Sequence, residues 1–210
     1  NGTLDKYIGD AIMTVFGVPY ANISDAKNAV FCALDMFSML DSLNKSNKKL
    51  PILNIGIGIS TGNVVSGNIG SEQRFEYTVI GDSVNLAARL ESATKTYNVN
   101  LLICEETYNE VKADFHCREI DTLLVKGKNI PVKVFTVIDS KNTKLTKQLL
   151  NFNLKYTKAL VYYKEKNYQK AIQFFQEADK LIANDGPTLF FLNKLKKDLS
   201  FTAENYIQFK

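Results

Sequence analysis

The pattern of apolar and polar positions divides the chain into two parts. Over the first two-thirds, apolar runs of strand length alternate with stretches in which apolar residues recur at helical spacing. Beyond about residue 140 only the helical spacing continues. This pattern predicts an α+β domain, a sheet covered by helices, followed by an all-helical tail. The predicted boundaries are a domain at 1–139, a polar Lys-rich linker at 140–150 and a tail at 151–210.

Each predicted element has a local signal, such as the Gly9-Asp10 dipeptide, which suits the tight turn of a hairpin. The strand expected at 64–69 would return beside the strand at 53–60. In chain order, the predicted elements are strands at 3–8 and 11–16, a helix at 24–44, strands at 53–60, 64–69 and 75–80, a helix from 84, a strand at 100–104, a helix at 105–112, strands at 115–124 and 132–138, and tail helices at 154–166, 168–184 and 187–199.

The stretch at 74–91, RFEYTVIGDSVNLAARLE, is predicted to form a strand, a turn and a helix. Its first half is aromatic and β-branched, which is typical of a buried strand. Gly81 then breaks the strand, and Asp82 or Ser83 can cap a helix that begins at Val84. A strand that leads through one glycine into a helix is therefore expected here.

This predicted helix carries two polar side chains that could do chemistry. Asn85 and Arg89 are four residues apart, so a helix places them on one face, while Leu86 and Leu90 would anchor a neighbouring face. An amide beside a guanidinium is typical of a group that faces ribose or phosphate, because Arg offers several donors to anionic oxygens. A solvated Arg and a capping Asn would explain the same spacing.

Composition narrows the possible functions. With 210 residues, of which 45% are hydrophobic, the chain can bury the core of one domain plus an appendage. The net charge is +4 without one long basic run, which disfavours nucleic-acid binding. Cys32, Cys104 and Cys117 lack metal-ligand spacing and indicate reduced thiols in a cytosolic setting.

No membrane segment is predicted in this chain, because no apolar run approaches the roughly twenty residues of a membrane span. We therefore expect a cytoplasmic location, although a longer parent protein could be membrane-anchored. The sequence starts at Asn1 inside what is read as a strand, so it is interpreted as a fragment.

Three blocks in the same order resemble the class III nucleotidyl cyclases, the adenylyl and guanylyl cyclases. They are residues 74–91, DKYIGDAIMTVFG at 5–17 and VKGK at 125–128. The resemblance implies a ferredoxin-like core with added elements. It also implies conversion of ATP to 3′,5′-cyclic AMP and pyrophosphate for intracellular signalling. The family's active site lies between two catalytic domains, which implies a homodimer with two sites.

Residue by residue, the resemblance implies a role for each matched side chain. Asp10 matches a metal-binding Asp that helps hold two Mg²⁺ or Mn²⁺ ions. Asn85 would orient the ribose, and Arg89 would stabilise charge on the phosphate in the transition state. Lys126 would hold the β- and γ-phosphates, although spacing alone does not separate it from Lys128.

The choice of base would depend on Lys6 and Thr78, which match the family's base-reading positions. A Lys ammonium only donates, so it suits the N1 acceptor of adenine and opposes the N1–H donor of guanine. A Thr hydroxyl can accept from the adenine N6 amine. Guanylyl cyclases typically have Glu at the Lys position, so Lys6 disfavours that alternative.

The chain departs from the family pattern at its start. The family's first metal-binding Asp lies in an earlier strand motif that is missing here, and Asp5 does not match that position. We therefore expect the 210 residues alone to have little cyclase activity. A non-catalytic cyclase-like regulatory or dimerisation module is a further alternative. His116, the single histidine, is interpreted as a strand residue.

The tail has the spacing of a tetratricopeptide repeat, with one copy visible. The residues with this spacing are Tyr162, Tyr168, Ala171, Phe175 and Ala178. Because a single repeat is not stable alone, we expect these helices to pack on the α+β domain or to continue an array. A protein partner for the tail is also expected from this resemblance.

Overall fold

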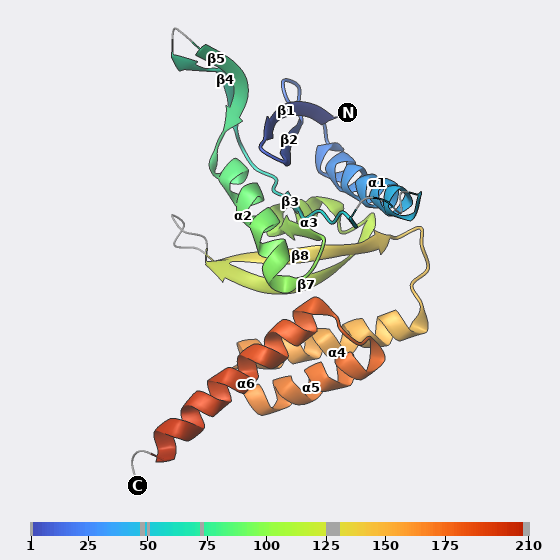
Figure 1. Ribbon diagram of the computed structural model, residues 1–210, viewed down its shortest axis with the longest axis vertical. Coiled ribbons are helices and arrows are strands. Elements are labelled where there is room, and N and C mark those ends of the chain that lie inside the picture. Colours follow the sequence, from blue (N-terminus) through green and yellow to red (C-terminus); the bar gives the residue numbers. More distant parts are fainter. Residues whose placement is uncertain (1, 47–48, 50, 72–73, 125–130, 208–210) are drawn as a thin grey trace.

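The computed structural model describes residues 2–46, 49, 51–71, 74–124 and 131–207 (Figure 1). Strands and helices are interspersed up to residue 140, and the elements described beyond it are all helices. The elements are β1 Gly2–Ile8, β2 Ala11–Phe16, α1 Asp25–Ser46, β3 Ile57–Ile59, β4 Val65–Ser71, β5 Arg74–Ile80, α2 Asp82–Tyr97, β6 Leu101–Cys104, α3 Glu105–Val111, β7 Phe115–Leu124, β8 Pro131–Ser140, α4 Lys147–Lys164, α5 Tyr168–Leu181 and α6 Gly186–Ile207.

The core of the α+β part is a four-stranded sheet in the order β3-β6-β8-β7. β3 lies parallel to β6, and the other two pairings are antiparallel. All four residues of β6 are buried, because its two faces are both covered. Leu101 and Ile103 pack with α1 and α3, whereas Leu102 and Cys104 pack with α2. The continuous apolar run of β6 therefore follows from its central place in the sheet.

Two hairpins stand apart from this sheet. β1 pairs with β2, and β4 pairs with β5, each pair forming a separate two-stranded sheet. The β4–β5 hairpin extends away from the helices at one end of the molecule (Figure 1). Most of the described residues of both hairpins are exposed or half-buried.

Three expectations about these strands are wrong. The strand predicted at 53–60 is only β3, three residues long. The strand predicted at 64–69 pairs with β5 and not with β3. β5 was expected to be buried, but Tyr77 and Ile80 are exposed and only Val79 among its described side chains is buried. Aromatic and β-branched composition identifies a strand, but the neighbours that would cover it are a tertiary property.

The tail is a bundle of three helices with its own aromatic core. The rings of Phe175 and Phe191 stack 5.1 Å apart, and Tyr156 meets Phe175 edge-on. Thr146 caps α4 by accepting a hydrogen bond from the Leu149 amide. α4 therefore begins at Lys147, earlier than the helix predicted from residue 154. The buried residues of this core are Phe152, Tyr156, Ala159, Leu160, Ala171, Phe175, Ala178, Phe191, Leu192 and Leu195.

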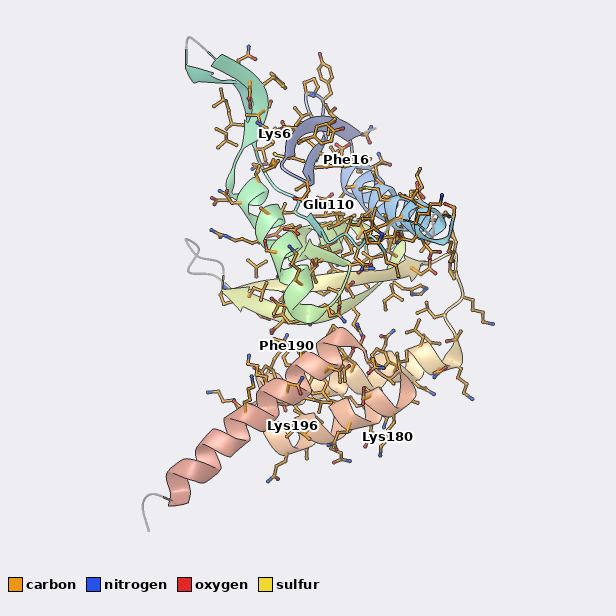
Figure 2. The ribbon with its side chains drawn as sticks, viewed as in Figure 1. Lys6, Phe16, Glu110, Lys180, Phe190 and Lys196 are labelled. Carbon is orange, nitrogen blue, oxygen red and sulfur yellow. The ribbon has the colours of Figure 1, made fainter. Side chains whose placement is uncertain are left out.

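The tail lies below the sheet in Figure 1, and Phe190 of the tail packs on the core that α2 forms with the sheet. The Tyr156 hydroxyl donates to the carbonyl of Ile120, and the Ile120 side chain packs with the buried residues of α2. The Tyr97 ring at the end of α2 lies 4.7 Å from the Phe190 ring of α6. Figure 2 shows Phe190 between the sheet and the bundle. The tail is thus joined to the α+β part by buried contacts.

Candidate active site

The predicted strand, turn and helix at 74–91 are present as β5, Gly81 and α2. Gly81 is the N-cap of α2, so the helix begins at Asp82, two residues before the predicted start. Leu86 and Leu90 are buried against the sheet, as the spacing predicts. Asn85 and Arg89 are both exposed. The apolar face thus anchors α2, and the two polar side chains are accessible to a ligand.

A glycine in β3 sets how closely α2 approaches the sheet. A Cβ on Gly58 would lie 2.2 Å from the Ala87 carbonyl oxygen and 2.4 Å from the Glu91 amide nitrogen. Only a residue without a side chain leaves room for the backbone of α2 at that distance. The position of the helix that carries Asn85 and Arg89 therefore depends on this contact.

Lys6 and Thr78 are far apart in sequence, but both contact the carboxylate of Asp5. The Lys6 ammonium lies 3.0 Å from the Glu76 carboxylate and 3.6 Å from that of Asp5. The Thr78 hydroxyl donates to Asp5 at 2.9 Å. Figure 2 shows Lys6 on the side of the β1–β2 hairpin that faces the β4–β5 hairpin.

The charge of Lys6 is stabilised by these neighbours. The hydrogen bond to Glu76 raises the pKa of the Lys6 ammonium above its usual value, and the nearby Asp5 carboxylate acts in the same direction. An ammonium has three N–H donors. One of them is donated to Glu76, and Asp5 at 3.6 Å forms an ion pair, so Lys6 retains a donor for an acceptor on a ligand.

Asp10 lies at the exposed tip of the β1–β2 hairpin, where Gly9 adopts a positive φ of 63°. Within the described part of the chain, the Asp10 carboxylate forms no ion pair with Arg89. Oxygen ligands of this kind suit Mg²⁺. Among the described residues, however, no group of three His, Cys, Asp or Glu side chains could hold a metal ion. These residues therefore do not form a complete two-metal site.

The remaining predicted residues lie elsewhere. Lys126 and Lys128 fall outside the described residues. His116 is a residue of β7 and pairs with Asp139 of β8, which agrees with its interpretation as a strand residue.

Sequence reasoning missed Asp5, which contacts both predicted base-reading side chains, and Glu76, which contacts Lys6. Their signal was the presence of an acid directly before Lys6 and of a second acid two residues before Thr78. These acids can be assigned a role only once the structure shows that β1 and β5 bring them into contact with Lys6 and Thr78. Of the predicted residues, the structure brings Lys6 and Thr78 together and leaves Asp10, Asn85 and Arg89 exposed.

Comparison with known proteins agrees with this architecture. The family model described as the adenylate and guanylate cyclase catalytic domain matches residues 5–158. A terminal-differentiation-specific adenylate cyclase of Dictyostelium discoideum is 33% identical over 213 residues, which cover 99% of this chain and 10% of that protein. This alignment therefore includes the tail helices as well as the sheet.

Two solved structures resemble the chain almost equally. The adenylyl cyclase CyaB from P. aeruginosa has a TM-score of 0.62 and 36% identity, over 69% of this chain and 75% of that chain. The guanylyl cyclase Cya2 has a TM-score of 0.61 with the same identity and coverage. Overall similarity thus does not distinguish an ATP-using from a GTP-using relative.

The chain belongs to the class III adenylate and guanylate cyclase catalytic domain family. It spans 10% to 28% of the length of the first curated relatives that it matches. In the part of the chain that the structure describes, no helix is both long and apolar enough to cross a membrane.

Proposed function

We propose that the protein is an adenylyl cyclase that converts ATP to 3′,5′-cyclic AMP and pyrophosphate for intracellular signalling. The observation that carries this proposal is the shared contact of Lys6 and Thr78 with Asp5. Thr78 lies on the strand that leads into the helix bearing Asn85 and Arg89. Because the compared structures include both an adenylyl and a guanylyl cyclase, the choice of base depends on these side chains.

Lys6 and Thr78 suit adenine through the pattern of donors and acceptors. The charged Lys6 ammonium donates to N1 of adenine, where guanine has an N–H donor instead. The Thr78 oxygen accepts from the N6 amine. A polar group that a wrong base leaves buried without a partner costs about 1–3 kcal/mol, enough to select between two nucleotides.

Asn85 and Arg89 act on the sugar and the phosphates. The Asn85 amide orients the ribose, and the Arg89 guanidinium stabilises charge on the α-phosphate as the 3′-hydroxyl attacks and pyrophosphate leaves. A preorganised donor of this kind is worth about 10²–10³ in rate. Lys126, outside the described residues, would hold the β- and γ-phosphates.

Divalent metal ions would complete the site. Class III cyclases generally depend on such ions, and we assign two Mg²⁺ or Mn²⁺ ions to the active enzyme, with Asp10 as one ligand. Bound metal ions would stabilise charge on the attacking and leaving oxygens. Among the described residues, Asp10 is the side chain that we assign to these ions.

The active form would be a homodimer in which each nucleotide contacts both subunits. Two observations support it. Asp10 and Arg89 form no ion pair within the described part of the chain. Both hairpins also expose large apolar side chains, including Tyr7 at 69% and Val65 at 72% exposure. Exposed apolar surface of this kind marks protein–protein contacts.

The tail is proposed to be a separate, tetratricopeptide-like domain at 151–210, joined to the catalytic domain at 1–139 by the linker at 140–150, of which residues 147–150 already form the start of α4. The helices α4 and α5, side by side in Figure 1, and their shared aromatic core support this division. Its partner would be another protein, and the protein would act in the cytoplasm.

The test is cyclic nucleotide formation by the natural full-length protein with Mn²⁺ and either ATP or GTP. We expect cyclic AMP, and we expect the double variant Lys6→Glu, Thr78→Cys to lower kcat/KM for ATP and raise relative use of GTP. A preference for GTP in the unaltered protein would favour a guanylyl cyclase. No product from either nucleotide would favour a non-catalytic regulatory module.

A further inference from the structure

Asp5 is a carboxylate buried among the proposed base-reading side chains. Its side chain is 5% exposed, compared with 30% for Lys6 and 46% for Glu76. Its Oδ2 atom accepts the Thr78 hydroxyl at 2.9 Å and lies 3.6 Å from the Lys6 ammonium. One oxygen of Asp5 therefore contacts both side chains that we assign to base reading.

A bulge in β1 places Asp5 there. Leu4 pairs with Thr14 and Lys6 with Met13, so Asp5 is an extra residue without a partner in the ladder. In a regular strand, consecutive side chains point to opposite faces. A bulge interrupts that alternation and redirects a side chain. Asp5 and Lys6 can therefore both reach the β5 strand.

We propose that Asp5 is a positioning residue that sets the direction of the Thr78 hydroxyl and thereby excludes purines with an oxygen acceptor at position 6. This inference rests on the proposed function, because it specifies how that site would read the base.

The argument follows from the chemistry of a hydroxyl group. A Thr hydroxyl has one hydrogen and two acceptor lone pairs, and it rotates to suit its partner. A freely rotating hydroxyl could accept from the 6-amino group of adenine or donate to a 6-oxygen. An ionised carboxylate only accepts, so the hydrogen of Thr78 is committed to Asp5. Towards the base, Thr78 then offers lone pairs alone.

The experiment isolates position 6 of the base in the natural full-length protein. Its two substrates are ATP and the triphosphate of 6-methoxypurine riboside. Both have an acceptor at N1 for Lys6, but the second has an oxygen acceptor in place of the 6-amino donor. The preference is the ratio of kcat/KM for ATP to kcat/KM for the methoxy analogue, measured from the cyclic products.

Asp5→Asn should lower this preference by roughly 10- to 100-fold, the range that separates a matched from a mismatched polar contact. The Asn amide can donate to Thr78 and so release the hydroxyl hydrogen. Asp5→Glu, which retains a carboxylate, should keep more of the preference than Asp5→Asn. The matched control is Asp41→Asn, an exposed acid on α1 that pairs with Lys45, which should leave the preference unchanged.

A second pair of variants tests whether Asp5 acts through Thr78. Thr78→Ser keeps a hydroxyl and should keep the preference, whereas Thr78→Val should lose it. In the Thr78→Val background, Asp5→Asn should have no further effect on the preference. A structural role for Asp5 would instead lower both kcat/KM values together in either background.

The proposal is overturned if folded Asp5→Asn protein, checked by circular dichroism, keeps the wild-type preference. It is also overturned if Asp5→Asn changes the preference equally with and without the Thr78 hydroxyl. If Asp5→Asn does not fold, equal preference in Thr78→Ser and Thr78→Val overturns it.

A failure of the proposed function has a different outcome. If the unaltered protein forms no cyclic product, binding of the same two nucleotides is measured by calorimetry instead of turnover. The preference is then the ratio of the dissociation constant of the methoxy analogue to that of ATP. Selective binding altered by Asp5→Asn would then support the role of Asp5 although the cyclase assignment failed. Absence of nucleotide binding would overturn both.

Discussion

On the tail side of the sheet, large side chains are buried within the chain, whereas on the hairpin side similar side chains are exposed. Tyr156 and Tyr97 are buried where α4 and α2 meet the sheet and α6. Tyr7 and Tyr77 are exposed on the two hairpins, close to the proposed site. Helix α2 connects these regions, since one end carries Asn85 and the other carries Tyr97.

Two arginine side chains differ in the same way, one being buried on the tail side and the other exposed on α2. Arg118 of β7 has a side chain only 9% exposed, and its guanidinium pairs with Asp185 at 2.8 Å. It also lies over the rings of Phe152 and Tyr156, at 5.0 and 4.6 Å from their centroids. Arg89 is exposed instead. Arg118 is therefore ion-paired inside the chain, although its buried Nε–H has no hydrogen-bond partner among the described residues, whereas Arg89 is exposed to solvent.

The largest effect is expected from substitutions on the hairpin side of the sheet, where the proposed site lies. Asp10→Ala and Arg89→Ala should each reduce cyclic AMP formation by about 10²–10³ or more, because both sites of a homodimer lose an essential group. Mixed dimers collect both defects in one site and leave the other intact. With free exchange, half of the dimers are mixed, so activity should return to roughly a quarter of wild type.

This experiment compares each variant alone with the co-expressed pair in the full-length protein. Co-purification through two different tags establishes that mixed dimers are present. Continued inactivity of such mixed dimers would mean that both residues serve one site of one chain.

The next largest effect is expected on the tail side of the sheet, where side chains are buried. Arg118→Ala leaves the half-buried Asp185 carboxylate with only its hydrogen bonds from Thr188 and removes the contacts with two rings, so it should lower the free energy of unfolding by about 3–5 kcal/mol. The control is Lys95→Ala, which removes an exposed pair with Glu91 and should change stability by less than about 0.5 kcal/mol.

Urea denaturation followed by circular dichroism measures both variants. Equal stability of Arg118→Ala and Lys95→Ala would mean that the tail does not depend on this ion pair for its attachment.

A smaller effect is expected where α2 meets the sheet between the two regions. Gly58→Ala places a methyl group against the backbone of α2 and should cost about 1–3 kcal/mol of stability. It should also lower kcat, because α2 carries Asn85 and Arg89. Gly67→Ala in β4, where a Cβ would have no neighbour within 4 Å, is the control. Thermal unfolding and activity at saturating ATP test the pair, and a harmless Gly58→Ala would refute the close approach.

The smallest effect concerns Tyr97 at the buried end of α2. Burial raises the pKa of Tyr97 above its usual value, and its hydrogen bond to Asp121, 2.7 Å long, acts in the same direction. Tyr97→Phe removes this bond and should cost about 1–2 kcal/mol at neutral pH. The advantage of Tyr97 is present below the unfolded pKa of about 10 and declines as pH rises above it.

Urea denaturation at pH 7 and at increasing pH above 10 measures this difference, with Tyr20→Phe as an exposed control. A stability difference between Tyr97 and Phe that does not shrink above pH 10 would show that ionisation of Tyr97 is not coupled to folding.

Much of the secondary structure could be read from the sequence because its signals are local. β2 and β7 begin and end at the predicted residues, and Leu86 and Leu90 are buried as their spacing requires. The strand β5 and the helix α2 could be predicted because Gly81 separates a strand-like apolar run from residues with helical spacing. The choice of Lys6 and Thr78 as neighbours came from a family resemblance, since 71 intervening residues separate them in the sequence.

Only the tertiary structure decided which surfaces meet. The partner of β4, the exposure of β5 and the bulge at Asp5 all depend on neighbours distant in sequence. The same holds for Arg118, whose pairing with Asp185 spans 67 positions. Periodicity shows that a helix or strand has an apolar and a polar side. The burial and hydrogen bonds of a side chain also depend on the residues that it contacts. The sequence thus determined the elements and their chemistry, and packing determined which of those groups were satisfied within the chain.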